Sequence, residues 1–174
     1  MSRRIPRILL WLFVMNLGIA LGAGLYEGRI VVPDWIVATE AGARWDAATA
    51  LADDTGRRFW VAVTTVPLTL LTLANLFVAW RATGRLRRWW LGAAGFALAD
   101  RVFTFSYFIP TMVRLTGAPD SPASVAAALQ WANLNHVRHL ILLTAWLAAL
   151  KAFSHLYRRE GAAHRVADEG RAYA

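Results

Sequence analysis

The chain has 174 residues, of which 57% are hydrophobic and 17% charged, a formal net charge of +8 and no cysteine. Soluble domains average about 45–50% apolar and about 25% charged residues, so this composition is typical of a membrane protein. It excludes a disordered chain, a disulfide scaffold, a thiolate metal site, a cysteine nucleophile and haem attachment through cysteine.

Four predominantly apolar segments follow one another along the chain. Residues 8–26 and 59–80 hold no charged side chain, and about 20 helical residues cross a bilayer core of about 30 Å. The third and fourth segments concentrate their polar groups in one short zone, whereas a soluble helix spreads them along an outer face. The sequence therefore predicts an all-α fold, a four-helix transmembrane bundle within residues 1–153. The expected spans are residues 8–32, 59–80, 89–113 and 124–153.

The loops between these segments predict the orientation of the bundle. Most of the 19 lysines and arginines lie in the N-terminal tail, the second loop and the C-terminal tail, residues 154–174. The positive-inside rule then places both termini in the cytoplasm, in a bacterial-type inner membrane. The same distribution explains the net charge without a basic groove, so we expect the bilayer and no nucleic acid as partner. A cleaved signal peptide is the alternative for the first segment, although its apolar run exceeds the usual 7–15 residues.

The first outer loop, residues 33–58, is too long for a simple turn. Apolar and aromatic residues between Asp34 and Leu51 predict a short amphipathic helix lying at the membrane interface. The run from Asp53 to Gly56 is expected to end that helix before the second span.

Ionisable residues within the predicted spans indicate a polar zone at one depth in the bundle. Glu27, Asp100, Arg101 and Arg138 come from three different spans, and their formal charges sum to zero. Such groups are costly in a membrane and therefore favour a functional site. The alternative is an ion network that only holds the helices in one arrangement.

The fourth span carries the densest polar pattern. Trp131, Asn135, Arg138 and His139 recur at helical spacing on one face, and His136 lies one turn before His139. On the third span, Asp100, Phe103 and Tyr107 share a face in the same way. We expect no metal and no cofactor, since the spacing contains no paired Glu-x-x-His motif; haem or a metal ion at His136 and His139 is the alternative.

Three short motifs resemble those of the anthrone-oxygenase-like family of small four-helix membrane proteins, most of which have no assigned function. Gly24-Leu-Tyr-Glu27, followed by Val32-Pro33-Asp34-Trp35, ends the first span. Tyr107-Phe-Ile-Pro110 ends the third, and Trp131-Ala-Asn-Leu-Asn135-His-Val-Arg138 opens the fourth. The resemblance implies a four-helix membrane protein acting on a small, lipophilic, anthrone- or quinol-like aromatic substrate.

That resemblance also implies a cofactor-independent oxygenase or oxidoreductase. His139 or His136 would take a proton from the substrate, and arginine and asparagine donors would hold the resulting oxyanion. The residues with expected catalytic roles are His139, His136, Arg138, Asn135, Glu27, Asp100 and Arg101. Those expected to contact the substrate are Trp131, Tyr107, Phe103 and Tyr26. The alternative is a non-catalytic membrane module: an assembly subunit, or a binder of haem, quinone or lipid. A homo-oligomer is compatible with either function.

Overall fold

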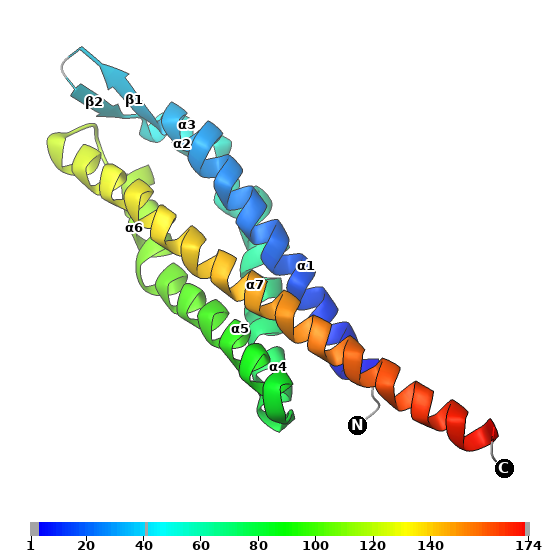
Figure 1. The fold of residues 1–174 in the computed structure, drawn as a ribbon. Coiled ribbons are helices and arrows are strands. Elements are labelled where there is room, and N and C mark those ends of the chain that lie inside the picture. Colours follow the sequence, from blue (N-terminus) through cyan, green and yellow to red (C-terminus); the bar gives the residue numbers. More distant parts are fainter. Residues whose placement is uncertain (1–3, 41, 173–174) are drawn as a thin grey trace.

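The computed structural model describes residues 4–40 and 42–172, with side chains up to Arg158. Four helical runs alternate in direction along most of the length of the molecule (Figure 1). The first run consists of α1 (Arg4–Tyr26), η1 (Glu27–Val31) and α2 (Val32–Trp35), and the second of η2 (Gly56–Thr65) and α4 (Val66–Arg81). The third run consists of α5 (Gly84–Phe103), η3 (Thr104–Phe108) and α6 (Ile109–Thr116), and the fourth is α7 (Pro122–Ala172). The segments η1, η2 and η3 are π-helical.

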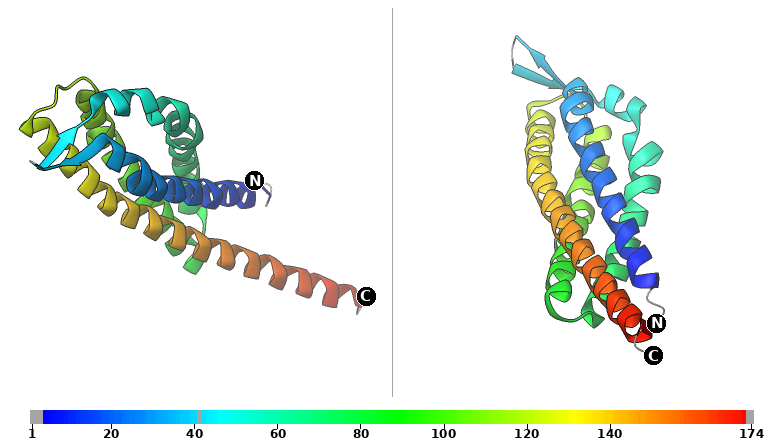
Figure 2. Two further views of the ribbon diagram at one scale, coloured as in Figure 1. Left: turned by 90° about the horizontal axis from the view of Figure 1, so that it is seen from above. Right: turned by 45° about the vertical axis from the view of Figure 1, so that its right-hand side comes forward.

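The four runs pack as a ring, in which α1 and α5 each contact both α4 and α7. Figure 2 shows them side by side, with the connection between the first two runs projecting at one end. The half of the bundle opposite that end is filled by apolar side chains, many of them alanine, which let the helices approach closely. Fully buried members of this core are Leu10, Phe13, Leu17, Leu68, Trp90, Ala93, Leu142 and Ala149.

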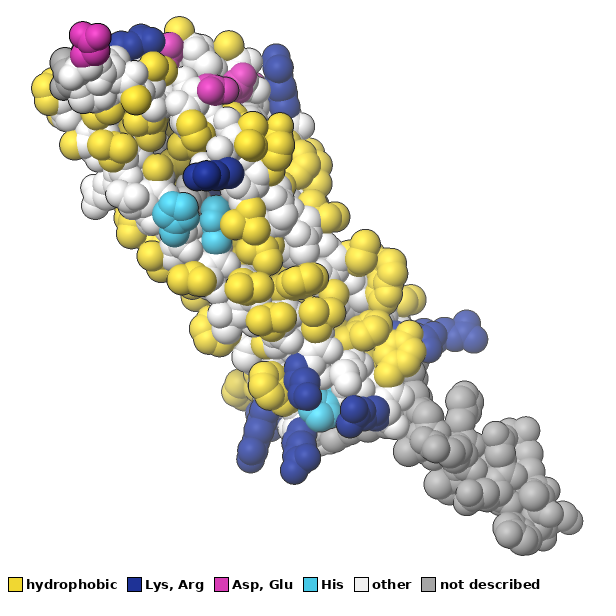
Figure 3. All heavy atoms as spheres, turned by 45° about the horizontal axis from the view of Figure 1, so that its top comes forward, with side chains coloured by type: hydrophobic (Ala, Val, Ile, Leu, Met, Phe, Trp, Pro, Cys, Tyr) yellow, Lys and Arg dark blue, Asp and Glu magenta, His cyan; other side chains and the backbone are white. Residues whose placement is uncertain are grey.

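The outside of the bundle is apolar in its middle and charged at its ends. Large hydrophobic side chains such as Trp11, Leu70 and Leu140 are at least half exposed. Figure 3 shows this apolar surface, with basic side chains gathered toward one end of it. Three helical stretches are long and apolar enough to cross a membrane: Arg4–Trp35, Gly56–Arg81 and Pro122–Arg158. The predicted helical fold with membrane-type helices is therefore confirmed, whereas the third run does not reach that level of hydropathy.

The first outer loop differs from its prediction. Between α2 and η2, β1 (Ile36–Thr39) and β2 (Gly42–Trp45) form an antiparallel hairpin, and a short helix, α3 (Ala47–Asp53), follows them. The hairpin is held by tertiary bonds: the Trp45 indole Nε1–H donates to Leu115 O (2.8 Å), and the Trp45 backbone N–H donates to Asp120 Oδ1 (3.1 Å). The expected helix break is present, because Asp54 has a left-handed φ of +43° and ends α3.

Each of the three π-helical segments is followed at once by an α-helix whose second residue is proline. These prolines are Pro33, Pro67 and Pro110. Proline lacks an N–H and its ring clashes with the carbonyl four residues earlier, so an ordinary α-helical turn cannot continue through it. A wider turn before the proline relieves that clash, and π-turns of this kind often mark functional sites. All three lie in the half of the bundle nearer the hairpin.

Candidate functional site

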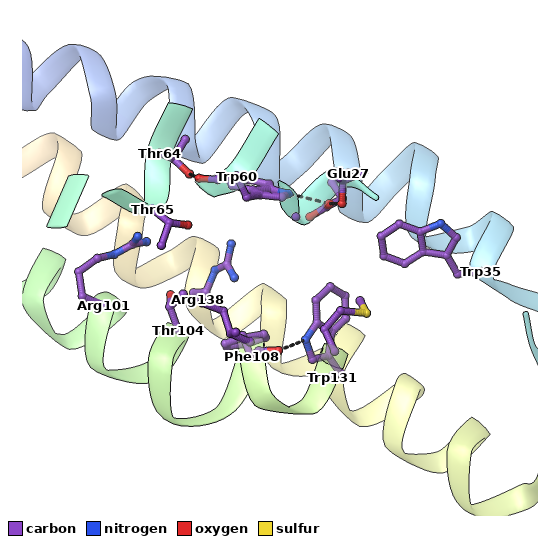
Figure 4. Close-up of a pocket in the computed structure, with 14 residues that line it drawn as sticks. Glu27, Trp35, Trp60, Thr64, Thr65, Arg101, Thr104, Phe108, Trp131 and Arg138 are labelled. Atoms are coloured by element: carbon purple, nitrogen blue, oxygen red, sulfur yellow. Dashed lines mark hydrogen bonds between the residues drawn. The ribbon is translucent and has the colours of Figure 1, made fainter. Parts of the chain in front are cut away.

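A cavity of about 110 Å³ lies among η1, η2, η3 and the facing part of α7. It thus lies at the level of the three π-helical segments that precede the prolines. Three charged side chains line it, Glu27, Arg101 and Arg138. Its other lining residues are aromatic, threonine or apolar: Trp35, Thr55, Gly56, Trp60, Thr64, Thr65, Thr104, Phe108, Ile109, Met112 and Trp131. Figure 4 shows both arginines rising from α5 and α7 into this space, with Glu27 and Trp60 on the far side.

Asp100 lies next to the side chains of both arginines. Its side chain is completely buried and accepts from Arg101 through Nε (3.0 Å) and through Nη2. Arg138 Nε lies 3.7 Å from the other carboxylate oxygen, Asp100 Oδ1, which is too long for a hydrogen bond. One carboxylate therefore lies next to guanidinium groups from two helices, and its single negative charge balances only one of their two positive charges.

Polar atoms at this network are left without a hydrogen-bond partner within the described part of the chain. They include Arg101 Nη1, Arg138 Nε and Asp100 Oδ1, each inaccessible to solvent. A buried donor without a partner costs about 1–3 kcal/mol, and more when it is charged. Arg138 Nε and Asp100 Oδ1 face one another at 3.7 Å, and Arg101 Nη1 is the further donor that an additional acceptor could satisfy.

Aromatic rings enclose the Arg138 guanidinium. Its Cζ lies 4.8 Å from the ring centroid of Phe108 and 5.7 Å from that of Trp60, both within the range of cation–π attraction. Trp131 is fixed beside them, because its indole Nε1–H donates to Phe108 O (3.2 Å) and its ring stands edge-on to Phe108. The cavity therefore has rigid, flat walls and a cationic end.

Glu27 forms the opposite side of the cavity with neutral partners. Its Oε1 accepts from Thr55 Oγ1 (2.6 Å) and from the indole Nε1–H of Trp60 (2.7 Å). These bonds hold the carboxylate toward η2, where Glu27 lines the cavity. An acidic and a cationic group thus face one space from different helices.

The structure brings together five of the residues proposed from the sequence. Glu27, Arg101, Arg138 and Trp131 line the cavity, and Asp100 is hydrogen-bonded to Arg101 and lies 3.7 Å from Arg138. The remaining residues lie elsewhere. Asn135 is buried on α7 but is not a lining residue, Phe103 and Tyr107 pack behind Phe108, and Tyr26 is 62% exposed.

The two histidines line a separate groove between α7 and the first run, at the end of α1 and in η1. His136 is exposed, whereas His139 is buried against Gly24, and both line this groove together with Arg29. Figure 3 shows histidine and basic side chains gathered amid the apolar surface of this face. Arg138 and His139 are separated in this way because neighbouring residues on an α-helix point about 100° apart. Among the described residues, no group of three or more histidine and acidic side chains is arranged to hold a metal.

Sequence reasoning missed the contribution of the second run. Trp60, Thr64 and Thr65 line the cavity, and none of them is among the site residues expected from the sequence. Two features of the sequence point to them in retrospect: the threonines lie two and three residues before Pro67, and a carboxylate within a span, Glu27, requires hydrogen-bond donors from a neighbouring helix.

The chain matches no protein-family model, no curated protein and no solved structure. Its function therefore has to be argued from the site itself.

Proposed function

We propose that this chain is a four-span integral membrane protein whose cavity binds a small, flat, lipophilic molecule as its anion and promotes its oxidation by O₂. Anthrone- and quinol-like aromatic molecules are the substrates that fit this description. The protein needs no cofactor in this proposal, because such an anion can itself reduce O₂. Both termini would be cytoplasmic in a bacterial inner membrane, since the basic residues gather at the end of the bundle that carries them.

The fourth membrane crossing is supported by how the third run distributes its polar groups. Asp100 and Arg101 are 0% and 5% exposed, so their charges face the inside of the bundle. Apolar side chains of the same run face outward: Phe96, Val102, Phe105, Ile109 and Val113. A helix with its charges on the inner face has a low mean hydropathy and still presents an apolar surface to lipid.

The observation that carries the proposal is the buried, incompletely bonded pair of arginines at one end of an aromatic cavity. Guanidinium groups with free donors in a site of low dielectric favour an oxyanion strongly. The flanking rings of Phe108, Trp60 and Trp131 favour a flat aromatic molecule over a compact ion such as phosphate. A phenolate or enolate of a ring system combines both properties.

The site also supplies a proton acceptor. Glu27 lines the cavity, whereas His136 and His139 line the separate groove, so we assign proton abstraction to the Glu27 carboxylate. It takes a proton from the acidic carbon of the substrate, and Arg138 and Arg101 hold the negative oxygen that results. The carbanion then forms a C–O bond with O₂, the proton returns to give a hydroperoxide, and loss of water leaves a carbonyl. In sum, a CH₂ group and O₂ become C=O and H₂O.

The test uses the full chain in proteoliposomes with anthrone as substrate under O₂. We expect anthraquinone to form faster than in empty vesicles, which report spontaneous oxidation, and one O₂ to be consumed per carbonyl formed. Arg138→Ala should lose most of this acceleration, while Arg29→Ala, which changes an exposed arginine outside the cavity, should keep it. Full activity of Arg138→Ala, with circular dichroism unchanged, would contradict the assigned role.

One observation favours a second candidate, a non-catalytic membrane module. Asp100 links α5 and α7 through Arg101 and Arg138, as an ion network that only fixes the helices would do. The two functions differ in ligand binding. A protein that binds neither anthrone nor the corresponding quinol in its cavity, yet unfolds on Asp100→Asn, would be such a module.

A further inference from the structure

A second hollow of about 310 Å³ lies on the side of the bundle, between the end of α1 and η2. Ala23, Tyr26, Val31 and Phe59 form its apolar outer part. Tyr26 is 62% exposed there. In a membrane this hollow would face lipid rather than water.

The hollow and the inner cavity share three lining residues: Glu27, Thr55 and Trp60. These three are one hydrogen-bonded cluster, because Glu27 Oε1 accepts from Thr55 Oγ1 at 2.6 Å and from Trp60 Nε1 at 2.7 Å. These three side chains, joined by two hydrogen bonds, form the partition that separates the apolar hollow from the arginines.

We propose that the ligand of the inner cavity arrives from the bilayer through this hollow, and that the Trp60 side chain is the part of the partition that moves. This inference rests on the proposed function for the identity of the ligand. Glu27 is anchored on the long first run, whereas Trp60 lies on η2, a few residues after the chain reverses at Asp54. Breaking the Trp60–Glu27 bond and turning the indole aside joins the two spaces.

The two spaces together define the class of molecule that can use this route. Among the described residues that line the outer hollow, Glu27 is the only charged one and most others are apolar or aromatic, so a permanently charged molecule is disfavoured there. The inner cavity offers two arginines and favours an anion. The ligand is therefore a weak acid that crosses the hollow in its neutral form and loses its proton in the inner cavity.

The volume of the inner cavity limits the size of the ligand. A cavity of about 150 Å³ holds benzene, so the inner cavity, at about 110 Å³, accommodates roughly one ring. A larger fused-ring molecule would extend past Trp60 into the hollow.

The test exploits the absence of cysteine from the chain. Thr65→Cys places a single thiol in the inner cavity, and Val31→Cys places one in the outer hollow. Each variant is reconstituted as the full chain and treated with an uncharged N-alkylmaleimide dissolved in the bilayer, or with a sulfonated maleimide added to the water. We expect Val31→Cys to react readily with the bilayer reagent, and Thr65→Cys to react slowly with it and hardly at all with the charged one.

A matched pair of tryptophan variants then tests the partition. Trp60→Phe and Trp131→Phe each remove one indole N–H bond from the cavity wall, but Trp131 lines only the inner cavity. In the Thr65→Cys background, Trp60→Phe should raise the rate with the bilayer reagent by about tenfold, the effect of losing one hydrogen bond, and Trp131→Phe should leave it unchanged.

Either of two results overturns this route: equal rates for the two tryptophan variants, or labelling of Thr65→Cys by the charged reagent as fast as by the bilayer reagent. Labelling uses no substrate, so its failure is distinct from a failure of the proposed function. That second failure would appear as a lack of anthrone binding and turnover in a protein whose Thr65→Cys thiol still reacts from the bilayer.

Discussion

Asp100 and Arg138 face one another across the contact between α5 and α7, with Arg138 Nε 3.7 Å from Asp100 Oδ1. The same carboxylate is already bonded to Arg101 through its other oxygen. Two guanidinium groups and one carboxylate thus lie together at one end of the aromatic cavity, and the carboxylate of Glu27 lines the cavity as well.

Removing the Asp100 charge should destabilise the bundle more than removing either arginine. Asp100→Asn keeps the shape of the side chain but leaves two buried guanidinium groups without a counter-charge. Breaking a buried ion pair in this way costs about 3–5 kcal/mol. Thermal unfolding in detergent measures the effect. Arg29→Gln, at an exposed arginine, is the control and should change stability by less than about 0.5 kcal/mol. Equal melting temperatures for Asp100→Asn and the unaltered protein would show that the network is not structural.

Gly24 should tolerate no side chain, because His139 fills the space beside it. A Cβ on Gly24 would lie 2.7 Å from His139 Nε2, a contact that forces the imidazole or the helix to shift. We expect Gly24→Ala to destabilise the protein by about 1–3 kcal/mol, as overpacking does. Gly22→Ala is a matched control two residues away, since nothing lies within 4 Å of its added Cβ. Gly24→Ala combined with His139→Ala should recover stability; if it does not, the loss has another cause.

Glu27→Gln should reduce turnover while leaving the cavity intact. The amide keeps an oxygen that accepts from Thr55 and Trp60 but is a far weaker proton acceptor than a carboxylate. The loss of a positioned base lowers a rate by about 10²–10⁴-fold. The rate of anthraquinone formation at saturating anthrone measures this loss, and Glu40→Gln in the hairpin loop is the control. An unchanged rate in Glu27→Gln would remove this carboxylate from the mechanism.

Acid should loosen the start of α3. The backbone N–H of Thr49 donates to Asp46 Oδ1 (3.0 Å), which lowers the pKa of Asp46 below its ordinary value of 3.8; the Thr49 hydroxyl and Arg44 act in the same direction. A lowered pKa in the folded protein means that this carboxylate stabilises α3 above the ordinary value and that the contribution is lost as the pH falls through the lowered pKa. Hydrogen-exchange protection of the Thr49 amide should therefore decrease below about pH 4. In Asp46→Ala the protection should be low throughout and independent of pH in this range.

The polar site was predicted in part from spacing and depth. Trp131 and Arg138 are seven residues apart on α7, two helical turns, and they do line one cavity with Glu27. His139 was grouped with them because it also fits the periodic pattern. That pattern cannot tell which of two adjacent buried residues faces the inside of the bundle and which faces a neighbouring helix. The packing of His139 on Gly24 decided the question.

The role of the second run and the hairpin could not be read from periodicity at all. A π-helical segment shifts the hydrogen-bond register by one residue, so side chains after it turn to faces that a 3.6-residue period does not predict. Trp60 and Glu27, which are hydrogen-bonded to one another, both lie within such segments, in η2 and η1. The hairpin depends on bonds to residues about 70 positions away, from Trp45 to Leu115 and Asp120, which no local pattern contains.

The cavity beside Arg138 makes the protein responsive to hydrostatic pressure. Unfilled internal volume is eliminated when a protein unfolds or when the space is occupied, so pressure favours both outcomes over the open cavity. Buried apolar side chains fill the half of the bundle around Phe13 and Trp90, so compression should act first on the half near the hairpin. A molecule that fits between the arginines and the aromatic rings would remove this sensitivity, so pressure distinguishes a filled site from an open one without any need to observe turnover.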